Sequence, residues 1–246
     1  MSEAKRLQVF MASCGIASRR ACEKLIVEGK VYVNGARAVL GSKVGPEDSV
    51  VYEGKLLAPE ARLRYIILNK PRGFVSSMSD EQDRPVAASL LGGSVSERVY
   101  NVGRLDQWSS GLLLFTNDGA LARILIHPSG GVDKEYLVHT DRPIPSELPA
   151  SFLKGLAIGE ERFRALEAEL LDPRTMRIVL LEGKNREIRR VLEHFGLRAL
   201  SLRRVRLGPI ALGDLAEGAS RELSPQEVSA LVAYSDKQGK GRGRAE

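Results

Sequence analysis

The chain has 246 residues, 43% of them hydrophobic, which is enough to form a core in one large domain or in a medium domain joined to a small one. A formal charge of +6 favours an anionic partner, and an aromatic content of 5% argues against recognition of many stacked nucleobases on an aromatic-rich sheet. The two cysteines, Cys14 and Cys22, have no nearby histidine, so neither a disulfide scaffold nor a metal site is expected.

The N-terminal stretch lacks the apolar core of a signal peptide, and no apolar run is long enough to span a bilayer. These two observations predict a cytoplasmic protein that makes no membrane contact.

Residues 1–60 are predicted to form two short helices and a hairpin. Apolar residues from Leu7 to Met11 follow helical spacing, and Ser18 is a candidate N-cap for a second helix. Residues 31–33 form a short strand that runs into Asn-Gly, the strongest two-residue signal for a β-hairpin. Three cations of the second helix lie off its apolar stripe: Arg19, Arg20 and Lys24. This basic face suits contact with phosphates, although a solvated charged face is a common alternative.

The next predicted strand covers residues 65–68 and ends at the sequence Asn-Lys-Pro-Arg-Gly, where proline and glycine interrupt it. Two cations in this turn, Lys70 and Arg72, either contact a phosphate backbone or brace a neighbouring loop. The sequence does not distinguish between these roles.

The central stretch, residues 101–119, places Asp106 on a loop just before a buried strand at residues 112–115. On spacing alone, a loop aspartate most often caps a turn or pairs with a surface arginine. The alternative is a carboxylate that is held rigidly by the strand and reaches into a cleft.

Further strands are predicted at residues 134–139, which carry Tyr136, and at residues 175–181. A helix with a strong apolar stripe follows, and Asn185 is its candidate N-cap. Arg189 lies at the edge of that stripe, where it can turn inward, whereas two other arginines of the same stretch point away from it: Arg186 and Arg190. Strands and helices alternate irregularly, which favours a mixed, mainly antiparallel α+β sheet over a doubly wound one.

Several motifs together resemble one family. The central G-R-L-D-x-x-S-x-G-L-L-L-F-T-N-D-G is accompanied by L-N-K-P-x-G, K-x-Y and G-x-N-R-E-I-R-R in the family's order. The sequence is similar to the pseudouridine synthases of the RsuA/RluB type, which modify ribosomal RNA. Near the N-terminus, G-I-A-S-R-R followed by L-I-V-E-G-K-V-Y-V-N-G resembles the alpha-L (S4-like) RNA-binding domain of that branch.

The resemblance implies an alpha-L RNA-binding domain at residues 1–60 and a catalytic domain at residues 64–235. The basic, glycine-rich residues 236–246 are expected to be a disordered tail. The resemblance further implies isomerisation of a specific uridine to pseudouridine in ribosomal RNA. The large subunit is favoured over the small one as the source of that RNA, and the expected partner is the RNA or a pre-ribosomal particle. A monomer without a cofactor or metal is expected.

By the same resemblance, Asp106 is the catalytic carboxylate, Arg189 is its partner and Tyr136 packs on the target uracil. Leu105 and Ile188 are expected to close a tight, apolar pocket around the base, and Arg104 to fill the vacated space or hold a phosphate. The remaining predicted RNA contacts are Lys70, Arg72, Arg19, Arg20, Lys24, Arg186 and Arg190. Gln107 and Trp108 depart from the smaller polar residues common at these positions in relatives, which affects substrate choice; Trp108 is interpreted as a packing or RNA-stacking residue.

Two other classes of function are compatible with parts of the sequence. A ribosome-assembly protein that binds RNA without catalysis would keep the fold and the basic faces. A nucleoside or glycoside hydrolase needs a second carboxylate to activate water, and Glu135 is the obvious candidate. Alternation along a strand makes Glu135 and Tyr136 face opposite ways.

Overall fold

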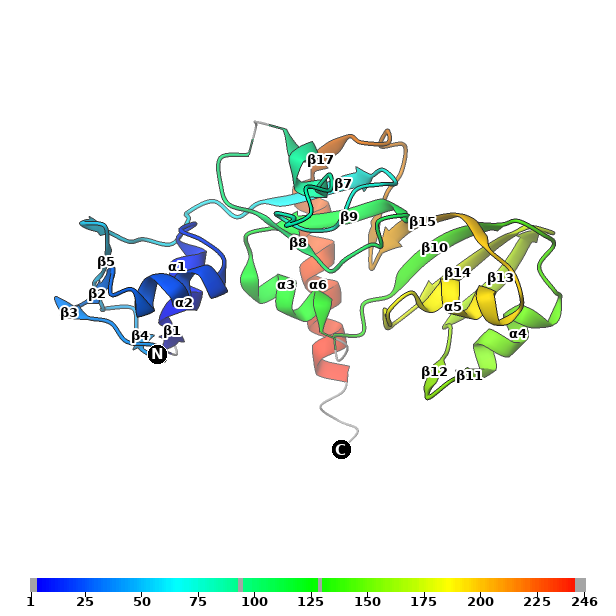
Figure 1. Cartoon of the computed structure of the whole chain (residues 1–246), viewed down its shortest axis with the longest axis horizontal. Helices are drawn as coiled ribbons and strands as arrows, with labels where there is room; N and C mark the ends of the chain where they lie inside the picture. The colour runs from blue at the N-terminus through cyan, green and yellow to red at the C-terminus, as the bar shows by residue number, and fades with distance from the viewer. Residues whose placement is uncertain (1–3, 93–94, 128–129, 242–246) are drawn as a thin grey trace. The chain divides into compact units, whose positions relative to one another are not determined.

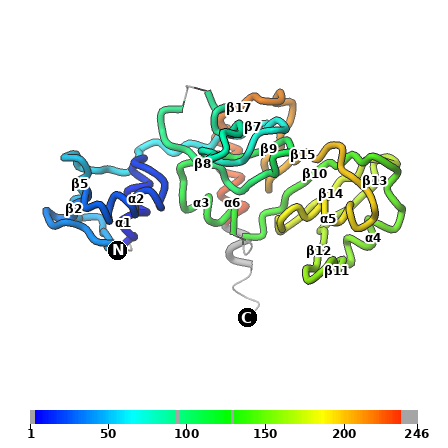
Figure 2. Tube along the Cα trace, viewed as in Figure 1, coloured from blue at the N-terminus to red at the C-terminus, as the bar shows by residue number. Residues whose placement is uncertain are grey.

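The computed structural model describes residues 4–92, 95–127 and 130–241 (Figures 1 and 2). They form two compact units, and the chain passes from the first to the second after Arg64. The first unit also contains two later segments, Val95–Val99 and Asn117–Gly119. The helices and strands of the first unit are β1 (Lys5–Arg6), α1 (Leu7–Ser13), α2 (Arg19–Val27), β2 (Val31–Val33), β3 (Ala36–Arg37), β4 (Lys43–Val44), β5 (Val50–Tyr52) and β6 (Lys55–Leu56).

The first unit packs α1 and α2 against small sheets. β2 and β3 form the hairpin predicted from Asn-Gly, and both turn residues have positive φ, 51° at Asn34 and 80° at Gly35. Ser18 caps α2, as predicted, by accepting a hydrogen bond from the backbone N–H of Ala21 at 3.2 Å. The core of this unit is formed by Leu7, Met11, Cys22, Ile26, Val31, Ala38, Val44 and Val50. The exposed residues of α2 are therefore on the side away from this core.

The sequence analysis placed Val95–Val99 and Asn117–Gly119 in the catalytic domain, whereas the structure groups them with the first unit. The carboxylate of Glu60 explains this grouping. Glu60 Oε1 accepts from the backbone N–H of Arg98 at 3.0 Å, and Glu60 Oε2 accepts from Asn117 Nδ2 at 2.8 Å. Asn117 Oδ1 in turn accepts from the backbone N–H of Arg64 at 2.8 Å. These long-range bonds hold both segments in the first unit, and nothing local in the sequence indicates them.

The second unit is built on a sheet of nine strands, with the path β13-β14-β10-β15-β9-β7-β17 and with β8 and β16 paired to β9 and β15. Its elements are β7 (Tyr65–Lys70), η1 (Ala87–Leu91), β8 (Tyr100–Val102), β9 (Ser110–Thr116), α3 (Gly119–Ile126), β10 (Lys134–Thr140), α4 (Glu147–Lys154), β11 (Leu156–Ile158), β12 (Glu161–Phe163), β13 (Glu167–Asp172), β14 (Thr175–Leu180), α5 (Glu187–His194), β15 (Ala199–Leu207), β16 (Ile210–Ala211), β17 (Ser220–Glu222) and α6 (Pro225–Gly241). β11 and β12 pair separately. The mixed, mainly antiparallel α+β architecture is confirmed.

Helices α3 and α6 cover the part of the sheet around β9 (Figure 1). Leu112 and Leu114 of β9 pack with Leu121 of α3, Leu207 of β15 and Leu231 of α6 in one buried cluster. Because β9 is buried on both faces, its apolar run is continuous and does not alternate with polar residues. The loop that carries Asp106 therefore leads into a strand buried on both faces.

The C-terminal segment corrects one prediction. α6 continues to Gly241, so residues 236–241, expected to be disordered, are helical, and the expectation for residues 242–246 lies outside the described residues. The helix begins on an apolar, core-forming segment that includes Leu231, and helix propagation costs less than nucleation. It therefore extends into the glycine-rich sequence that composition alone marks as unstructured.

β15 is parallel to β9 and antiparallel to β10, and the parallel contact requires a glycine. Arg203 pairs with Ser110 and Arg204 with Gly111. Gly111 has φ of 101°, and a Cβ atom there would lie 2.2 Å from the backbone oxygen of Arg204. The two strands meet this closely only because Gly111 has no side chain.

We predict that Gly111→Ala lowers the free energy of unfolding by about 3 kcal/mol or more, because strain at positive φ adds to a clash with backbone. Gly218→Ala is the matched control, since Gly218 also has positive φ, 81°, but no atom within 4 Å of the added Cβ. It should cost about 1 kcal/mol. Urea unfolding measures both, and equal losses in the two variants would contradict the close strand contact.

Candidate active site

Asp106 lies on the loop between β8 and β9, and the backbone on both sides of it is fixed. Ser76 Oγ donates to the carbonyl of Leu105 at 2.9 Å and accepts from the N–H of Leu105 at 3.0 Å. The N–H of Ser109 donates to the carbonyl of Asp106 at 3.0 Å. The Asp106 side chain is 35% exposed, so its carboxylate is held on a rigid loop yet stays accessible.

Lys70, at the end of β7, lies beneath this loop and not on an RNA-facing surface. It is completely buried, and its Nζ donates to the carbonyls of Pro71 and Phe74, both at 2.8 Å, and of Gln107 at 3.4 Å. Burial lowers the pKa of Lys70 to about 8, while the nearby Asp106 charge raises it. The prediction that Lys70 contacts RNA is therefore wrong, and of its two possible roles the structure favours bracing of the loop.

Arg189, in α5, approaches the same loop from another element. Its Nε is 3.8 Å from Asp106 Oδ2, and its Nη2 donates to the carbonyl of Trp108 at 2.9 Å and to Ser109 Oγ at 3.4 Å. The side chain is only 12% exposed, and burial lowers the arginine pKa while Asp106 opposes that shift. Arg189 Nε is buried without a hydrogen-bond partner, so the carboxylate supplies its opposite charge at a distance too long for a hydrogen bond.

Tyr136, in β10, is 8% exposed and reaches the vicinity of the loop through the register of the sheet. Arg204 of β15 pairs with Tyr136 on one side and with Gly111 of β9 on the other. The three residues thus form a row across adjacent strands, with Gly111 following the Asp106 loop. The structure gives no direct contact between Tyr136 and Asp106.

Most of the other side chains predicted to contact RNA are exposed. Arg104 is exposed, as are Arg72 and Arg186; Arg72 Nη1 donates to the carbonyl of Leu200 at 3.0 Å, and Arg186 forms an ion pair with Glu193 at 3.2 Å. In α2, all three cations are exposed: Arg19, Arg20 and Lys24. These side chains are the ones available to a polyanion.

Arg190 is partly buried and already occupied. It pairs with Glu161, and its guanidinium lies 4.6 Å from the ring centre of Phe163. A stabilising contact between α5 and the β11–β12 hairpin accounts for this arginine better than the predicted RNA contact does.

The tight apolar pocket expected around the base, closed by Leu105 and Ile188, stays a prediction. Leu105 and Ile188 are 6% and 4% exposed, so both are largely covered by protein. Hollows of about 730 Å³ and 400 Å³ lie elsewhere, the larger beside the loop that precedes α5 and the smaller beside Asn69 and Arg203. Asp106 instead occupies an open, half-buried position.

Sequence reasoning missed two buried charged residues, Glu187 and Arg204, and the half-buried Lys134 with which both interact electrostatically. Lys134 Nζ donates to the carbonyls of Val132 at 2.7 Å and of Leu181 at 3.1 Å, and burial lowers its pKa to about 8. The K-x-Y spacing carried a usable signal, because alternate residues of a strand share a face and Lys134 accompanies Tyr136. Nothing in the local sequence marks Glu187 or Arg204 as buried.

Glu135, the second carboxylate that a hydrolase would need, is engaged elsewhere. Its Oε2 accepts from Arg206 Nε at 3.0 Å, and Arg206 also pairs with Asp133 at 2.7 Å. Glu135 therefore has a strong partner already, which disfavours a role in activating water. Among the described residues, no cluster of potential ligands could hold a metal ion.

Comparison with known proteins identifies the family of the chain. Residues 64–194 match the model of the RNA pseudouridylate synthase family, and residues 5–50 match the S4 domain. The chain belongs to the RNA pseudouridylate synthase family. It combines the two domains in the RsuA/RluB arrangement and is an enzyme.

Named relatives cover almost the whole chain. The ribosomal large subunit pseudouridine synthase B of Bacillus subtilis is 37% identical, with 94% of this chain and 97% of that protein aligned. The dual-specificity RNA pseudouridine synthase RluF of Shigella flexneri is 35% identical, with 98% and 83% aligned. A crystal structure of a pseudouridylate synthase, 27% identical, superposes with a TM-score of 0.68 over 92% of this chain and 99% of that one. In the described part of the chain, no helix combines the length and apolar character needed to cross a membrane.

The buried ammonium of Lys70 should make the stability of the folded protein depend on pH. Because its pKa in the folded protein, about 8, lies below 10.5, the unfolded chain binds more protons between these values, and the stability of the folded protein rises with pH. We expect the wild type to gain about 2 kcal/mol over Lys70→Met between pH 7.5 and 9.5. Urea unfolding across this range measures the difference, and the exposed Lys154→Met is the control. Lys134 is present in the wild type and in Lys70→Met alike, so its contribution cancels from the difference in stability between them. A pH-independent difference would contradict the proposed burial of the ammonium.

Proposed function

We propose that this enzyme converts a specific uridine of large-subunit ribosomal RNA to pseudouridine, with Asp106 as the group that acts on the sugar. The observation that supports the assignment of Asp106 is its pairing with a buried guanidinium, 3.8 Å from Arg189 Nε, on an accessible loop. The RNA source is inferred from relatives whose names describe large-subunit enzymes, in Bacillus subtilis and Pseudomonas aeruginosa.

The reaction breaks the bond between the anomeric carbon C1′ and N1 of uracil and joins C1′ to C5 of the same base. C5 then loses its proton and N1 gains one, so the product is an isomer of the substrate. C1′ becomes electron-poor when its bond to N1 breaks, and an ionised carboxylate can attack or stabilise such a carbon, as in glycosidases. Asp106 provides that carboxylate.

Arg189 positions Asp106 in this proposal. Its Nε lies 3.8 Å from Asp106 Oδ2, and Arg189 is held in place by two further bonds to residues 108 and 109. Because Arg189 donates to the loop backbone as well, it fixes the loop that carries the carboxylate.

The target base must leave the RNA structure to reach Asp106, at a cost of a few kcal/mol. In this proposal Tyr136 of β10, which is separated from β9 by β15, covers one face of the flipped uracil. The exposed Arg104, two residues from Asp106, holds an adjacent phosphate or fills the vacated space. Because the Asp106 side chain is 35% exposed, the RNA itself completes the enclosure of the base in this proposal.

We predict that Asp106→Asn abolishes release of tritium from RNA labelled at uridine C5 and leaves RNA affinity within about threefold, because the amide keeps the shape of the side chain but has no charge. The assay uses an unmodified large-subunit rRNA transcript, and filter binding measures affinity. Retained activity would refute the role of Asp106, and an inactive wild type would favour a non-catalytic assembly protein.

Carbodiimide-dependent stops of reverse transcription, compared in RNA from cells with and without the protein, locate the modified uridine. If the only stop that disappears in cells without the protein lies in small-subunit RNA, the large-subunit assignment is overturned.

The basic face of α2 is proposed to bind RNA phosphates. We predict that Arg19→Ala/Arg20→Ala/Lys24→Ala weakens RNA binding and reduces the slope of log K against log salt by about 2, because each phosphate contact contributes about 0.7 for single-stranded RNA. Lys43→Ala/Lys55→Ala removes two exposed cations of the same unit outside α2 and is the control. An unchanged slope in the triple variant would exclude this face.

A further inference from the structure

Trp108 is the one tryptophan of the chain; it lies two residues from Asp106, and the residue is 54% exposed. Single exposed apolar residues are common on protein surfaces and need no special explanation. This one differs because its backbone is fixed while its indole remains in solvent.

The backbone around Trp108 is held from several sides. Its carbonyl accepts from Arg189 Nη2 at 2.9 Å, and the next residue, Ser109, is 2% exposed. On the other side, Gln107 is tied to Gly73 by two bonds: the N–H of Gly73 donates to the Gln107 carbonyl at 2.8 Å, and Gln107 Nε2 donates to the Gly73 carbonyl at 3.1 Å. The indole is thus carried on a rigid support and not on a mobile loop tip.

One guanidinium contacts the backbone of Trp108, and two more act on that guanidinium. Arg189 Nη2 donates to the Trp108 carbonyl at 2.9 Å, and Arg189 experiences the charges of Arg186 and Arg72 as well as the opposite charge of Glu193, which pairs with Arg186 at 3.2 Å. Arg72 and Arg186 are exposed. A flat aromatic face beside cations is the combination that binds single-stranded nucleic acid, with bases on the ring and phosphates on the cations.

We propose that Trp108 is a stacking platform for the nucleobase adjacent to the target uridine and thereby contributes to the choice of substrate. This proposal rests on the proposed function, because the sugar of the target is assigned to Asp106. Two residues of backbone span at most about 7 Å, so a base stacked on Trp108 belongs to a nucleotide close to the one that reacts. Stacking holds the flanking strand while the target uracil is turned out toward Asp106.

The tertiary structure favours this role over local packing. A packing tryptophan covers apolar neighbours with its ring and becomes largely buried, whereas Trp108 remains more than half exposed. The low aromatic content noted in the sequence is compatible with the proposal, since it requires one stacked base and no aromatic-rich sheet.

The test is a set of substitutions read by steady-state kinetics of tritium release from the large-subunit rRNA transcript. Trp108→Ala should raise KM about tenfold or more, in line with the usual strength of base–aromatic stacking, and change kcat less than threefold. Trp108→Phe should restore KM to within about threefold of the wild type because it retains a π-face, and Trp108→Leu should not. Leu171→Ala, which truncates another exposed apolar side chain of the second unit, is the control and should leave KM unchanged.

A second measurement needs no variant. Because Trp108 is the sole tryptophan, intrinsic fluorescence reports its environment directly, and titration with the same transcript should quench it along the binding isotherm. Binding without any change in fluorescence, or an unaltered KM in Trp108→Ala, would overturn the proposal, as would equal rescue by Leu and Phe. An inactive wild type whose fluorescence is still quenched would refute the proposed function but support RNA stacking at Trp108.

Discussion

The Asp106 loop depends on two buried cations that hold its backbone carbonyl groups. Lys70 Nζ reaches the carbonyl of Gln107, and Arg189 Nη2 reaches that of Trp108. Consecutive carbonyls are therefore turned toward protein cations, and the preceding Asp106 carboxylate stays accessible at 35% exposure. An ammonium or guanidinium deprived of water is costly unless it donates hydrogen bonds or faces an anion, so these cations and the loop constrain each other.

The sheet brings these groups together from distant parts of the sequence. β7 supplies Lys70, and β9 begins directly after the loop. β15 places Arg204 beside Gly111, and β10 places Tyr136 on the other side of Arg204. The close approach of β15 to β9 at Gly111 is the step that brings the Tyr136 strand near the loop. A side chain at that position would separate the two halves of the sheet, because backbone of β15 occupies the space.

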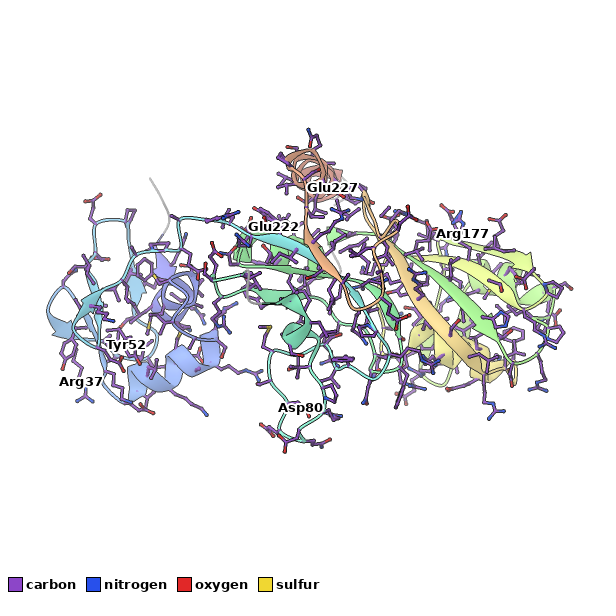
Figure 3. All side chains as sticks on the ribbon, turned by 90° about the horizontal axis from the view of Figure 1, so that it is seen from above. Arg37, Tyr52, Asp80, Arg177, Glu222 and Glu227 are labelled. Atoms are coloured by element: carbon purple, nitrogen blue, oxygen red, sulfur yellow. The ribbon has the colours of Figure 1, made fainter. Side chains whose placement is uncertain are left out.

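A further feature of the second unit is a loop between β7 and η1 whose outer part carries Asp80 (Figure 3). Arg84 binds the Asp80 carboxylate through Nε and Nη2, the latter at 2.7 Å, and these contacts lower the pKa of Asp80 to about 2. The same loop begins near Ser76, which makes two hydrogen bonds to Leu105. Leu105, the residue before Asp106, is thus supported by a loop that is itself internally cross-linked.

The sequence alone was sufficient for the local elements and for the family. Helical spacing, the Ser18 cap, the Asn-Gly hairpin and the buried run of β9 are properties of short segments, and local sterics and hydrogen bonding determine them. The motifs around Asp106 and Arg189 likewise pointed to two residues whose side chains lie 3.8 Å apart in the folded chain. Local reasoning failed at Asn185: the N-cap of α5 is Arg186, with φ of 52°, while Glu187 accepts from the N–H of Lys184. It also failed for the end of α6.

Only the tertiary structure decided that Lys70 is a buried brace, that Arg190 is engaged by Glu161 and Phe163, and that Trp108 remains exposed. The physical reason is that burial and the partner of a charge depend on residues far away in the chain, and these contacts exist only after the sheet has formed.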